Sequence, residues 1–494
     1  MLINMSIIGG DNMSEREEYI TKFISNELSG VPFQLNDNLK INGEIMNERD
    51  EFIILKSLID VFIEGNKLNR YIVMPGLRGV GKTTLLYQSY DYLLNEKNVS
   101  PNQIFLLSCE DLNDFVSCDL RELIEIFLDK FHNKTLRTLE KDIFLLIDEA
   151  QYDKNWSKDG KIIYDKTKHV FMIFTGSSAL HLEYNADSAR RMVKKTIPPL
   201  NYTQHLKLKY GLSFNGMSDS LKGLLFEGDV DAAIEYERKT NDALVNFVGY
   251  TDDDWMEYVN YGGFPTLFEE NDYKILSGKL VDLTKKIINT DLLNFKNFSS
   301  ENQANANRIL KFLALQKPGE ASQPKLTNHL RTSAANVKSI LDMLEKTQII
   351  FHCEPYGESS KRIKKSWKYY FATSSLRNVL AREYGTSLSQ SEHEGTIFEN
   401  LVAANLFSLS NNLNELFSVY YDGNSKKNVD FIVQKNFDKM IPIEVGRGKK
   451  NQKQMNSAMN RFDCEYGIIV SNRTNVIEKH DEIIYVPLKT FSFL

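Results

Sequence analysis

The chain has 494 residues, enough for about two to four domains. Its composition, 42% hydrophobic and 26% charged, is that of an ordinary globular protein. The formal net charge of −6 excludes a global basic field that would attract nucleic acid or anionic membranes, so any nucleic-acid contact must be local. No apolar run reaches transmembrane length, no basic start precedes the apolar N-terminal stretch, and the four cysteines show no metal-ligand spacing. We therefore expect a cytoplasmic protein without disulfides.

The N-terminal region, residues 1–45, has weak periodicity and contains Pro32 and several asparagines that interrupt it. We expect it to form an extension that packs on the following domain or on a partner. A helix is predicted to begin near Arg49, because apolar residues from Phe52 to Ile59 follow at helical spacing.

A glycine-rich motif follows the first predicted strand, Tyr71 to Met74. Gly76–Thr83 matches Gly-x-x-x-x-Gly-Lys-Thr and leads into a helix-like stretch, an arrangement typical of a P-loop. Glycines let backbone N–H groups point at phosphate oxygens, Lys82 supplies a cation for the β- and γ-phosphates, and the Thr83 hydroxyl can hold Mg²⁺. The alternative is a plain glycine turn between two core elements. We expect contacts to the nucleotide from Gly76, Gly79, Gly81, Lys82, Thr83, Thr84 and Ser177.

Two acidic residues follow a second apolar run, residues 143–147, that suits a strand buried on both faces of a parallel sheet. Asp148 and Glu149 would then lie at the edge where open α/β sheets bind ligands. Asp148 would hold Mg²⁺, directly or through water, and Glu149 would polarise the attacking water. Taken alone, the pair could simply start a helix.

A third predicted strand, residues 169–174, ends in the small hydroxyl residues of Thr175–Ser178. Beside the γ-phosphate, such residues can position water and report hydrolysis. Arg190 and Arg191 follow in a polar stretch, where a guanidinium could stabilise charge on the transferred phosphoryl group, in cis or from a neighbouring subunit. The alternative is a solvated arginine pair.

These motifs together resemble those of the archaeal-type AAA ATPases. The segments that carry the resemblance are Gly76–Thr83, Leu145–Glu149 followed by Ala150 and Gln151, Thr175–Ser178, Arg191 ahead of Pro199 and Leu200, and Tyr261–Pro265. The resemblance spans roughly residues 45–450. It implies ATP and Mg²⁺ as cofactors, Glu149 and Lys82 as catalytic residues, and Arg191 as the arginine finger. The family has Gly-Arg where this chain has Arg190 and Arg191.

Many members of that family carry a C-terminal domain distantly similar to PD-(D/E)xK nucleases. We therefore expect an α/β fold with a P-loop AAA-type parallel sheet, a helical lid, a winged helix and a nuclease-like α/β domain. The expected divisions are an N-terminal extension at 1–45, the P-loop ATPase core at 46–210, the lid at 211–300, the winged helix at 301–375 and the nuclease-like domain at 376–494.

The predicted winged helix combines three amphipathic helices with a pair of strands. Its wing is rich in basic residues, which could contact DNA phosphates. Many ATPases instead use a winged helix as a lid or a brace between domains. The basic residues are Lys361, Arg362, Lys364, Lys365 and Lys368.

Three carboxylates mark the C-terminal region. Asp430 and Glu444 fall on two predicted adjacent strands, and Glu399 on a helix, which together suggest a second site for a hard cation. In PD-(D/E)xK nucleases, a lysine two residues beyond the glutamate helps to activate water; here Gly446 takes that position, and Lys450 lies off the strand register. We expect little or no nuclease activity from this set.

Three functions remain open from the sequence. The first is an ATPase switch that controls a protein partner, or the chain's own C-terminal domain. The second is an ATP-gated DNA nuclease that defends against foreign DNA. The third is an ATP-responsive winged-helix protein that binds DNA.

Overall fold

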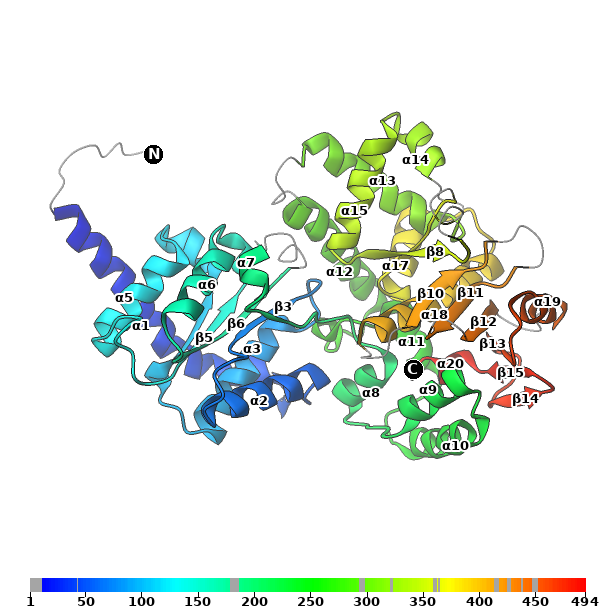
Figure 1. Cartoon of the computed structure of the whole chain (residues 1–494), viewed down its shortest axis with the longest axis horizontal. Helices are drawn as coiled ribbons and strands as arrows, with labels where there is room; N and C mark the ends of the chain where they lie inside the picture. Colours follow the sequence, from blue (N-terminus) through cyan, green and yellow to red (C-terminus); the bar gives the residue numbers. More distant parts are fainter. Residues whose placement is uncertain are drawn as a thin grey trace. The chain divides into compact units, whose positions relative to one another are not determined.

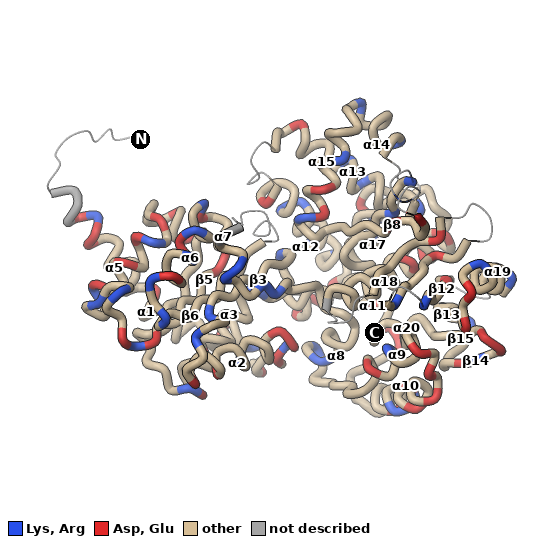
Figure 2. Tube along the Cα trace, viewed as in Figure 1, with Lys and Arg blue, Asp and Glu red and all other residues tan. Residues whose placement is uncertain are grey.

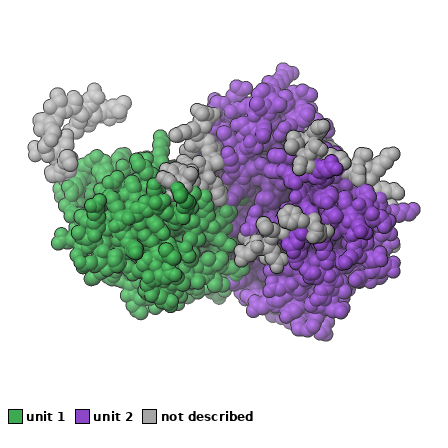
Figure 3. Space-filling view, viewed as in Figure 1, with its two compact units in different colours: residues 1–197 green, residues 198–494 purple. Residues whose placement is uncertain are grey.

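The computed structural model in Figure 1 describes residues 11–41, 43–177, 186–292, 298–319, 323–358, 362, 365–412, 417–423, 428–436, 439–446 and 452–494. The chain forms two compact units, residues 1–197 and 198–494, coloured green and purple in Figure 3. Lys and Arg residues are interspersed with Asp and Glu residues along both units (Figure 2). In the described part of the chain, no helix is both long enough and apolar enough to cross a membrane.

The first unit is built around a parallel five-stranded sheet in the order β4-β5-β6-β3-β7. The strands β3, β4, β5 and β6 are largely apolar and almost wholly buried, as expected for a parallel sheet covered on both faces, whereas the two-residue edge strand β7 is partly exposed. Its elements are α1 (Asp11–Leu39), β1 (Lys40–Ile41), β2 (Glu44–Ile45), α2 (Asp50–Ile63), β3 (Tyr71–Pro75), α3 (Lys82–Asp91), β4 (Ile104–Ser108), α4 (Cys109–Asp111), α5 (Leu120–His132), β5 (Ile143–Asp148), α6 (Trp156–Lys166), β6 (Val170–Gly176), α7 (Ala186–Ala189) and β7 (Val193–Lys194).

The N-terminal region is more regular than its sequence suggests. α1 is one 29-residue helix that contains Pro32, so the expectation that proline and asparagines interrupt this segment is wrong. Ile20 and Ile24 are buried in the same core as the central strands, and the Tyr87 hydroxyl donates to Gln34 at 2.8 Å. Tertiary packing of one apolar face has therefore overridden weak local propensity.

The second unit contains the helices that follow the first sheet and a mixed eight-stranded sheet, ordered β14-β15-β13-β12-β11-β10-β8-β9. Its helices are α8 (Tyr202–Tyr210), α9 (Met217–Glu227), α10 (Val230–Asn246), α11 (Asp253–Tyr261), α12 (Tyr273–Lys286), α13 (Ser300–Leu315), α14 (Gln323–Leu330), α15 (Ala334–Lys346), α17 (Ser374–Tyr384), α18 (Gln390–Asn412), α19 (Gln452–Phe462) and α20 (Leu488–Phe491). Its strands are β8 (Ile350–Pro355), β9 (Lys368–Phe371), β10 (Phe417–Tyr421), β11 (Phe431–Lys435), β12 (Lys439–Gly446), β13 (Gly467–Ser471), β14 (Glu478–His480) and β15 (Ile483–Val486).

In this unit, the segments predicted as the lid, the winged helix and the nuclease-like domain share one apolar core, and the last two also share one sheet. One apolar core joins residues of α8–α11 to residues of α18, β11–β13 and the C-terminal helix α20. β8 pairs antiparallel with β9, as in the predicted wing, and also parallel with β10 of the C-terminal region. The fivefold division of the chain stays a prediction, and the sheet continues across its boundary at residue 375.

Candidate nucleotide-binding site

The glycine-rich loop connects the buried strand β3 to helix α3, which begins at Lys82. Gly79 and Gly81 have φ angles of +77° and +94°, a region that side chains with a Cβ rarely adopt. Gly76 is needed for a different reason, since a Cβ there would lie 2.5 Å from the carbonyl oxygen of Ile197. The loop therefore depends on glycine at each of the three predicted positions.

The predicted phosphate-binding lysine lies folded into this loop. Lys82 is 5% exposed, and its Nζ donates to the carbonyl oxygens of Gly76 at 3.1 Å and Leu77 at 3.0 Å. Thr83 and Thr84 follow it in the first turn of α3, where backbone N–H groups have no partner within the helix. A helix N-terminus of this kind favours an anion.

Asp148 is the centre of the polar network at the ends of β5 and β6. The Thr83 hydroxyl donates to its Oδ2 at 2.6 Å, the Thr175 hydroxyl donates to its Oδ1, and the Glu149 backbone N–H donates to Oδ1 at 2.9 Å. Burial raises the pKa of Asp148 and the charge of Glu149 adds to this, while the two hydroxyl groups oppose it. The structure thus places the P-loop threonine directly on the predicted Mg²⁺ carboxylate.

Glu149 is held by a residue to which the sequence analysis gave no role. The Gln151 side-chain amide donates to Oε2 of Glu149, and its carbonyl oxygen accepts from the backbone N–H of Ser177 at 3.1 Å. Gln151 is 4% exposed and Ser177 is 1% exposed. Gln151 therefore links the predicted water-polarising carboxylate to the end of β6. The available signal was its position two residues after Glu149, at the end of a buried strand.

Glu149 itself occupies a conformation that is unusual for a residue with a side chain. Its φ angle is +49°, in the left-handed region, immediately after β5 ends at Asp148. Such a conformation costs free energy of order 1–3 kcal/mol and persists only where the surroundings determine it. Two hydrogen bonds supply that constraint. The Glu149 backbone N–H donates to the Asp148 carboxylate, and the Glu149 carboxylate accepts from the Gln151 amide.

Arg49 is a second residue without a predicted role in the site, and it bonds to the backbone of the P-loop. Arg49 precedes α2, is 4% exposed, and donates from Nη1 to the carbonyl oxygen of Val80 within the P-loop. Its Nε pairs with Glu51 at 2.8 Å. No local pattern links position 49 to the loop, because the contact joins residues far apart in the chain.

The predicted arginine finger lies after helix α7. Its Nε pairs with Oδ1 of Asp165, at the end of α6, at 2.6 Å. The Arg191 side chain is 29% exposed. The structure thus gives Arg191 a carboxylate partner on its own unit, and the finger role stays a prediction. Ser178 lies outside the described residues.

The donor set fits Mg-ATP. A hydroxyl and a carboxylate, Thr83 and Asp148, are hard oxygen ligands side by side, as Mg²⁺ prefers. The Lys82 ammonium and the two glycines with positive φ angles, Gly79 and Gly81, lie in the loop that precedes Thr83. Because Gly76 has no side chain, the loop can approach the backbone of Ile197 closely.

The C-terminal carboxylates lie in the other unit. Phe431 is opposite Ile443 in the β11–β12 ladder, so Asp430 and Glu444 are the next residues along these two strands. Oδ2 of Asp430 accepts from the Val445 backbone N–H at 2.8 Å. Among the described residues, no group of three or more His, Cys, Asp and Glu side chains could hold a metal ion. The predicted second metal site therefore gains no support.

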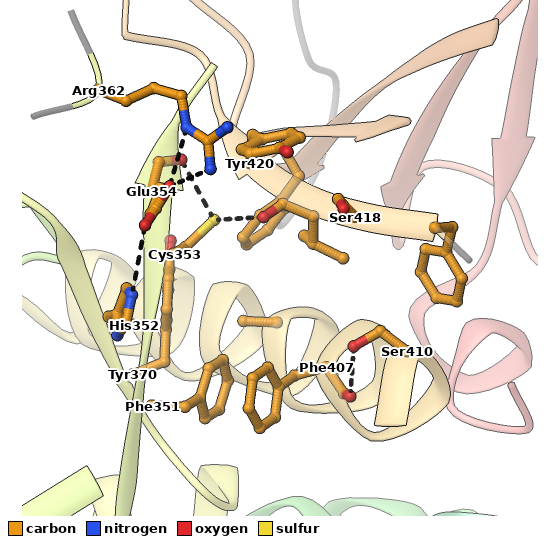
Figure 4. A pocket seen from close by; sticks show the side chains of 14 residues that line it. Phe351, His352, Cys353, Glu354, Arg362, Tyr370, Phe407, Ser410, Ser418 and Tyr420 are labelled. Carbon is orange, nitrogen blue, oxygen red and sulfur yellow. Dashed lines mark hydrogen bonds and ion pairs between the residues drawn. The ribbon is translucent and has the colours of Figure 1, made fainter. Parts of the chain in front are cut away.

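The predicted DNA-contacting residues can be placed only in part, because Lys361 and Lys364 lie outside the described residues. Arg362 pairs with Glu354 through two nitrogens and lies over the Tyr420 ring, 4.8 Å from its centroid (Figure 4). It borders a cavity of about 250 Å³ where β8 and β10 diverge. Lys365 donates to the carbonyl oxygen of Gly423. The described basic side chains thus have partners within the chain.

Comparison with known families identifies three segments of the chain. Residues 68–206 match an AAA domain, residues 252–388 match a domain of unknown function named DUF8612, and residues 394–491 match another named DUF4143. The first segment contains every predicted nucleotide contact.

Relatives resemble the chain over most of its length. The uncharacterized protein MJ1637 of Methanocaldococcus jannaschii is 30% identical over 478 residues, which cover 96% of this chain and 94% of that protein. An uncharacterized protein of Haemophilus influenzae is 23% identical over 387 residues, which cover 76% of this chain and 81% of that protein.

Solved structures show a more distant likeness. The Orc1 protein of Aeropyrum pernix, solved in complex with DNA, covers 70% of this chain and 96% of its own, with 10% identity and a TM-score of 0.30. AMPPCP-bound DnaA from Aquifex aeolicus covers 61% of this chain and 90% of its own, with 15% identity and a TM-score of 0.25.

Proposed function

This chain belongs to the same family as protein MJ1637 of Methanocaldococcus jannaschii and contains an AAA domain, and we propose that it is an ATPase that binds and hydrolyses Mg-ATP. The observation that carries the proposal is the contact of the Thr83 hydroxyl with Asp148, 2.6 Å apart, beside a P-loop that encloses Lys82. This joins the two predicted nucleotide motifs, which are 65 residues apart in the chain, into one site.

Each residue of the site has a distinct role in this proposal. Lys82 would exchange the loop carbonyls for the β- and γ-phosphates, and the N–H groups of the loop would bind phosphate oxygens. Thr83 and Asp148 would hold Mg²⁺, which supplies charge that neutralises the phosphates. Glu149 takes a hydrogen bond from the attacking water and orients it towards the γ-phosphate.

The position of Ser177 suggests how the site responds to the nucleotide. Ser177 follows β6, and its backbone N–H is tied through Gln151 to Glu149. A γ-phosphate at this strand end would compete for the N–H and free Gln151, so that the carboxylate moves when ATP is exchanged for ADP. The proposed output is a switch that controls a protein partner or the second unit.

The test compares the native protein with Lys82→Ala and Glu149→Gln. Lys82→Ala should lose ATP affinity at least about tenfold, because it removes the phosphate cation. Glu149→Gln should keep ATP affinity and lose turnover about 100-fold or more, because an amide polarises water poorly. The matched controls are Lys168→Ala, at the opposite end of β6, and Glu140→Gln; both positions are exposed. A folded Lys82→Ala protein with native ATP affinity would refute the proposal.

The two alternatives make different predictions. An ATP-gated nuclease would cut plasmid DNA with Mg²⁺ and lose this activity in Asp430→Ala. A DNA-binding regulator would show a salt-dependent gel shift that weakens in Lys365→Glu. The partners already held by Arg362 and Lys365 favour neither alternative over the ATPase switch.

A further inference from the structure

A buried arginine from outside the nucleotide motifs holds one peptide group of the P-loop. Arg49 lies directly before α2, and its Nη1 donates to the carbonyl oxygen of Val80, the residue before Gly81. Arg49 is 4% exposed, and Val80 is fully buried. The contact joins positions that are 31 residues apart in the chain. It therefore fixes the direction of the peptide between Val80 and Gly81.

The charge of Arg49 is compensated where it lies. Its Nε pairs with Oε2 of Glu51 at 2.8 Å, and only 7% of the Glu51 side chain is exposed. A carboxylate this close to the guanidinium cancels most of the field that the guanidinium would exert further away. Arg49 thus acts on the loop mainly through its hydrogen bond to Val80, and much less through its charge.

Helix α2 gives Arg49 a firm support, because α2 packs on the helix that the P-loop opens. The ring of Phe52 meets the ring of Tyr92 edge to face, with centroids 6.3 Å apart, and the Tyr92 hydroxyl donates to Asp60 at 2.7 Å. Tyr92 follows α3 directly. Phe52 and Asp60 lie about two turns apart on α2, so this helix is held at two points along its length.

The loop sequence by itself does not fix the peptide that Arg49 holds. Gly81 has a φ angle of +94°, and a glycine can rotate here at little steric cost. A donor behind the loop is therefore needed to keep the Val80 carbonyl oxygen, and with it the whole peptide plane, in one direction.

The same peptide carries the Gly81 N–H on its other side. The Val80–Gly81 peptide is trans, and in a planar trans peptide the C=O and N–H bonds point in opposite directions. With the carbonyl oxygen turned towards Arg49, the Gly81 N–H points away from it. The N–H groups of a P-loop cradle the α- and β-phosphates of a nucleotide. We propose that Arg49 is a positioning residue that aims the Gly81 N–H at the β-phosphate, an inference that rests on the proposed ATPase function.

The first test measures the affinity of full-length Arg49→Met for ATP and for ADP. Methionine fills part of the space but cannot donate to Val80. Both nucleotides carry a β-phosphate, so each should bind about tenfold more weakly. The kcat at saturating ATP should stay within about threefold of the native value, because the lost contact is made before and during the reaction alike. The matched control is Lys56→Met, on the same helix, whose ion pair with Glu48 at 2.7 Å lies outside the P-loop; it should bind both nucleotides as the native protein does.

The split between affinity and kcat separates positioning from a purely structural role. A variant that is merely less stable loses active protein, while its folded molecules keep the native nucleotide affinity. Native affinity for both nucleotides in folded Arg49→Met would overturn the proposal, and so would a loss confined to kcat. If the native protein itself binds no ATP, the ATPase function fails together with this inference. If the native protein and Arg49→Met bind ATP equally, only this inference fails.

The second test separates the hydrogen bond to Val80 from the buried ion pair. Glu51→Gln keeps the Arg49 donor and should bind ATP and ADP at least as tightly as the native protein. The double variant Arg49→Met/Glu51→Gln should show the same tenfold loss as Arg49→Met. The double variant also replaces Arg49→Met if that protein does not fold, since it leaves no buried carboxylate without the Arg49 charge. Binding in Glu51→Gln as weak as in the double variant would overturn the proposal, because the ion pair and not the hydrogen bond would then carry the effect.

Discussion

At the scale of single residues, the site works through side chains that hold one another. Asp148 is buried and accepts from two threonine hydroxyls, Thr83 and Thr175, so its two oxygens point in known directions. Gln151 holds the Glu149 side chain in place, because its amide donates to the Glu149 carboxylate while its carbonyl oxygen accepts from the Ser177 backbone N–H. Positioning of this kind matters because small displacements of a catalytic group cost large factors in rate.

We predict that Gln151→Leu lowers ATP turnover about 10- to 100-fold while ATP affinity stays near the native value. Leucine has a similar volume but can neither donate to Glu149 nor accept from Ser177. Gln151→Glu should also be slow, because it places a second carboxylate against Glu149. Turnover and ATP binding measured side by side provide the check. A native turnover rate in Gln151→Leu, with Glu149→Gln inactive, would show that Gln151 does not position the carboxylate.

His205 on α8 gives the second unit a built-in sensitivity to acid. It is 3% exposed, aromatic rings surround it, and neither of its ring nitrogens has a hydrogen-bond partner among the described residues. Burial lowers its pKa from 6.5 to about 3, with the charge of Lys209 adding to the effect. The unfolded state therefore binds a proton more readily than the folded state.

The stability contributed by neutral His205 is present above pH 6.5 and is lost as the pH falls from 6.5 towards 3. The free energy of unfolding should fall by up to about 4 kcal/mol when the pH reaches about 3. His205→Phe keeps an aromatic ring but cannot be protonated. Its free energy of unfolding should therefore change less with pH between 6.5 and 3 than that of the native protein. Denaturant unfolding at several pH values measures the effect, with His480→Phe on an exposed strand as the control. Equal pH dependence in native and His205→Phe proteins would rule out this role.

At the scale of elements, the P-loop is shaped by the strands on either side of it. β3 lies between β6 and β7, and Gly76 continues this pairing with a bridge to Ile197. Its N–H donates to the carbonyl oxygen of Gly176 at 3.2 Å. The loop therefore begins between two neighbouring chain segments, with no space for a side chain.

Gly76→Ala should destabilise the first unit by about 1–3 kcal/mol and weaken ATP binding, because its Cβ would meet backbone rather than a movable side chain. Gly30→Ala is the matched control. It lies within α1 with nothing inside 4 Å of the added Cβ, and so should stabilise that helix by about 0.5–1 kcal/mol. Chemical denaturation and nucleotide titration of both variants test the pair. Native stability and affinity in Gly76→Ala would mean that the loop can move aside.

At the scale of the whole molecule, Lys and Arg residues are interspersed with Asp and Glu residues over the part of the chain that the structure describes. The net charge is −6, and the described members of the predicted DNA-binding set, Arg362 and Lys365, bond to groups within the chain. Lys368, the fifth basic residue of the predicted wing, is buried against Glu399 rather than exposed. The expectation that it forms part of an exposed phosphate-binding cluster is therefore wrong.

We accordingly predict that the native protein does not shift a duplex DNA fragment at about 150 mM salt, with or without ATP. The combined change Arg362→Glu/Lys365→Glu should leave this result unaltered. Gel-shift titrations at two salt concentrations measure it. A specific shift that the double change abolishes would restore DNA binding as a function of this unit.

The sequence by itself determined the parts whose chemistry is local. Gly76–Thr83 follows a buried strand and opens a helix, and Asp148 and Glu149 follow a second strand, as predicted from apolar runs and motif spacing. Such features depend on neighbouring residues and on the period of a strand or helix. Only the tertiary structure placed Arg49 behind the P-loop, Gln151 between Glu149 and Ser177, and Lys368 beside Glu399. Their roles depend on contacts between residues distant in the chain or on the path of a side chain, and neither leaves a periodic signal in the sequence.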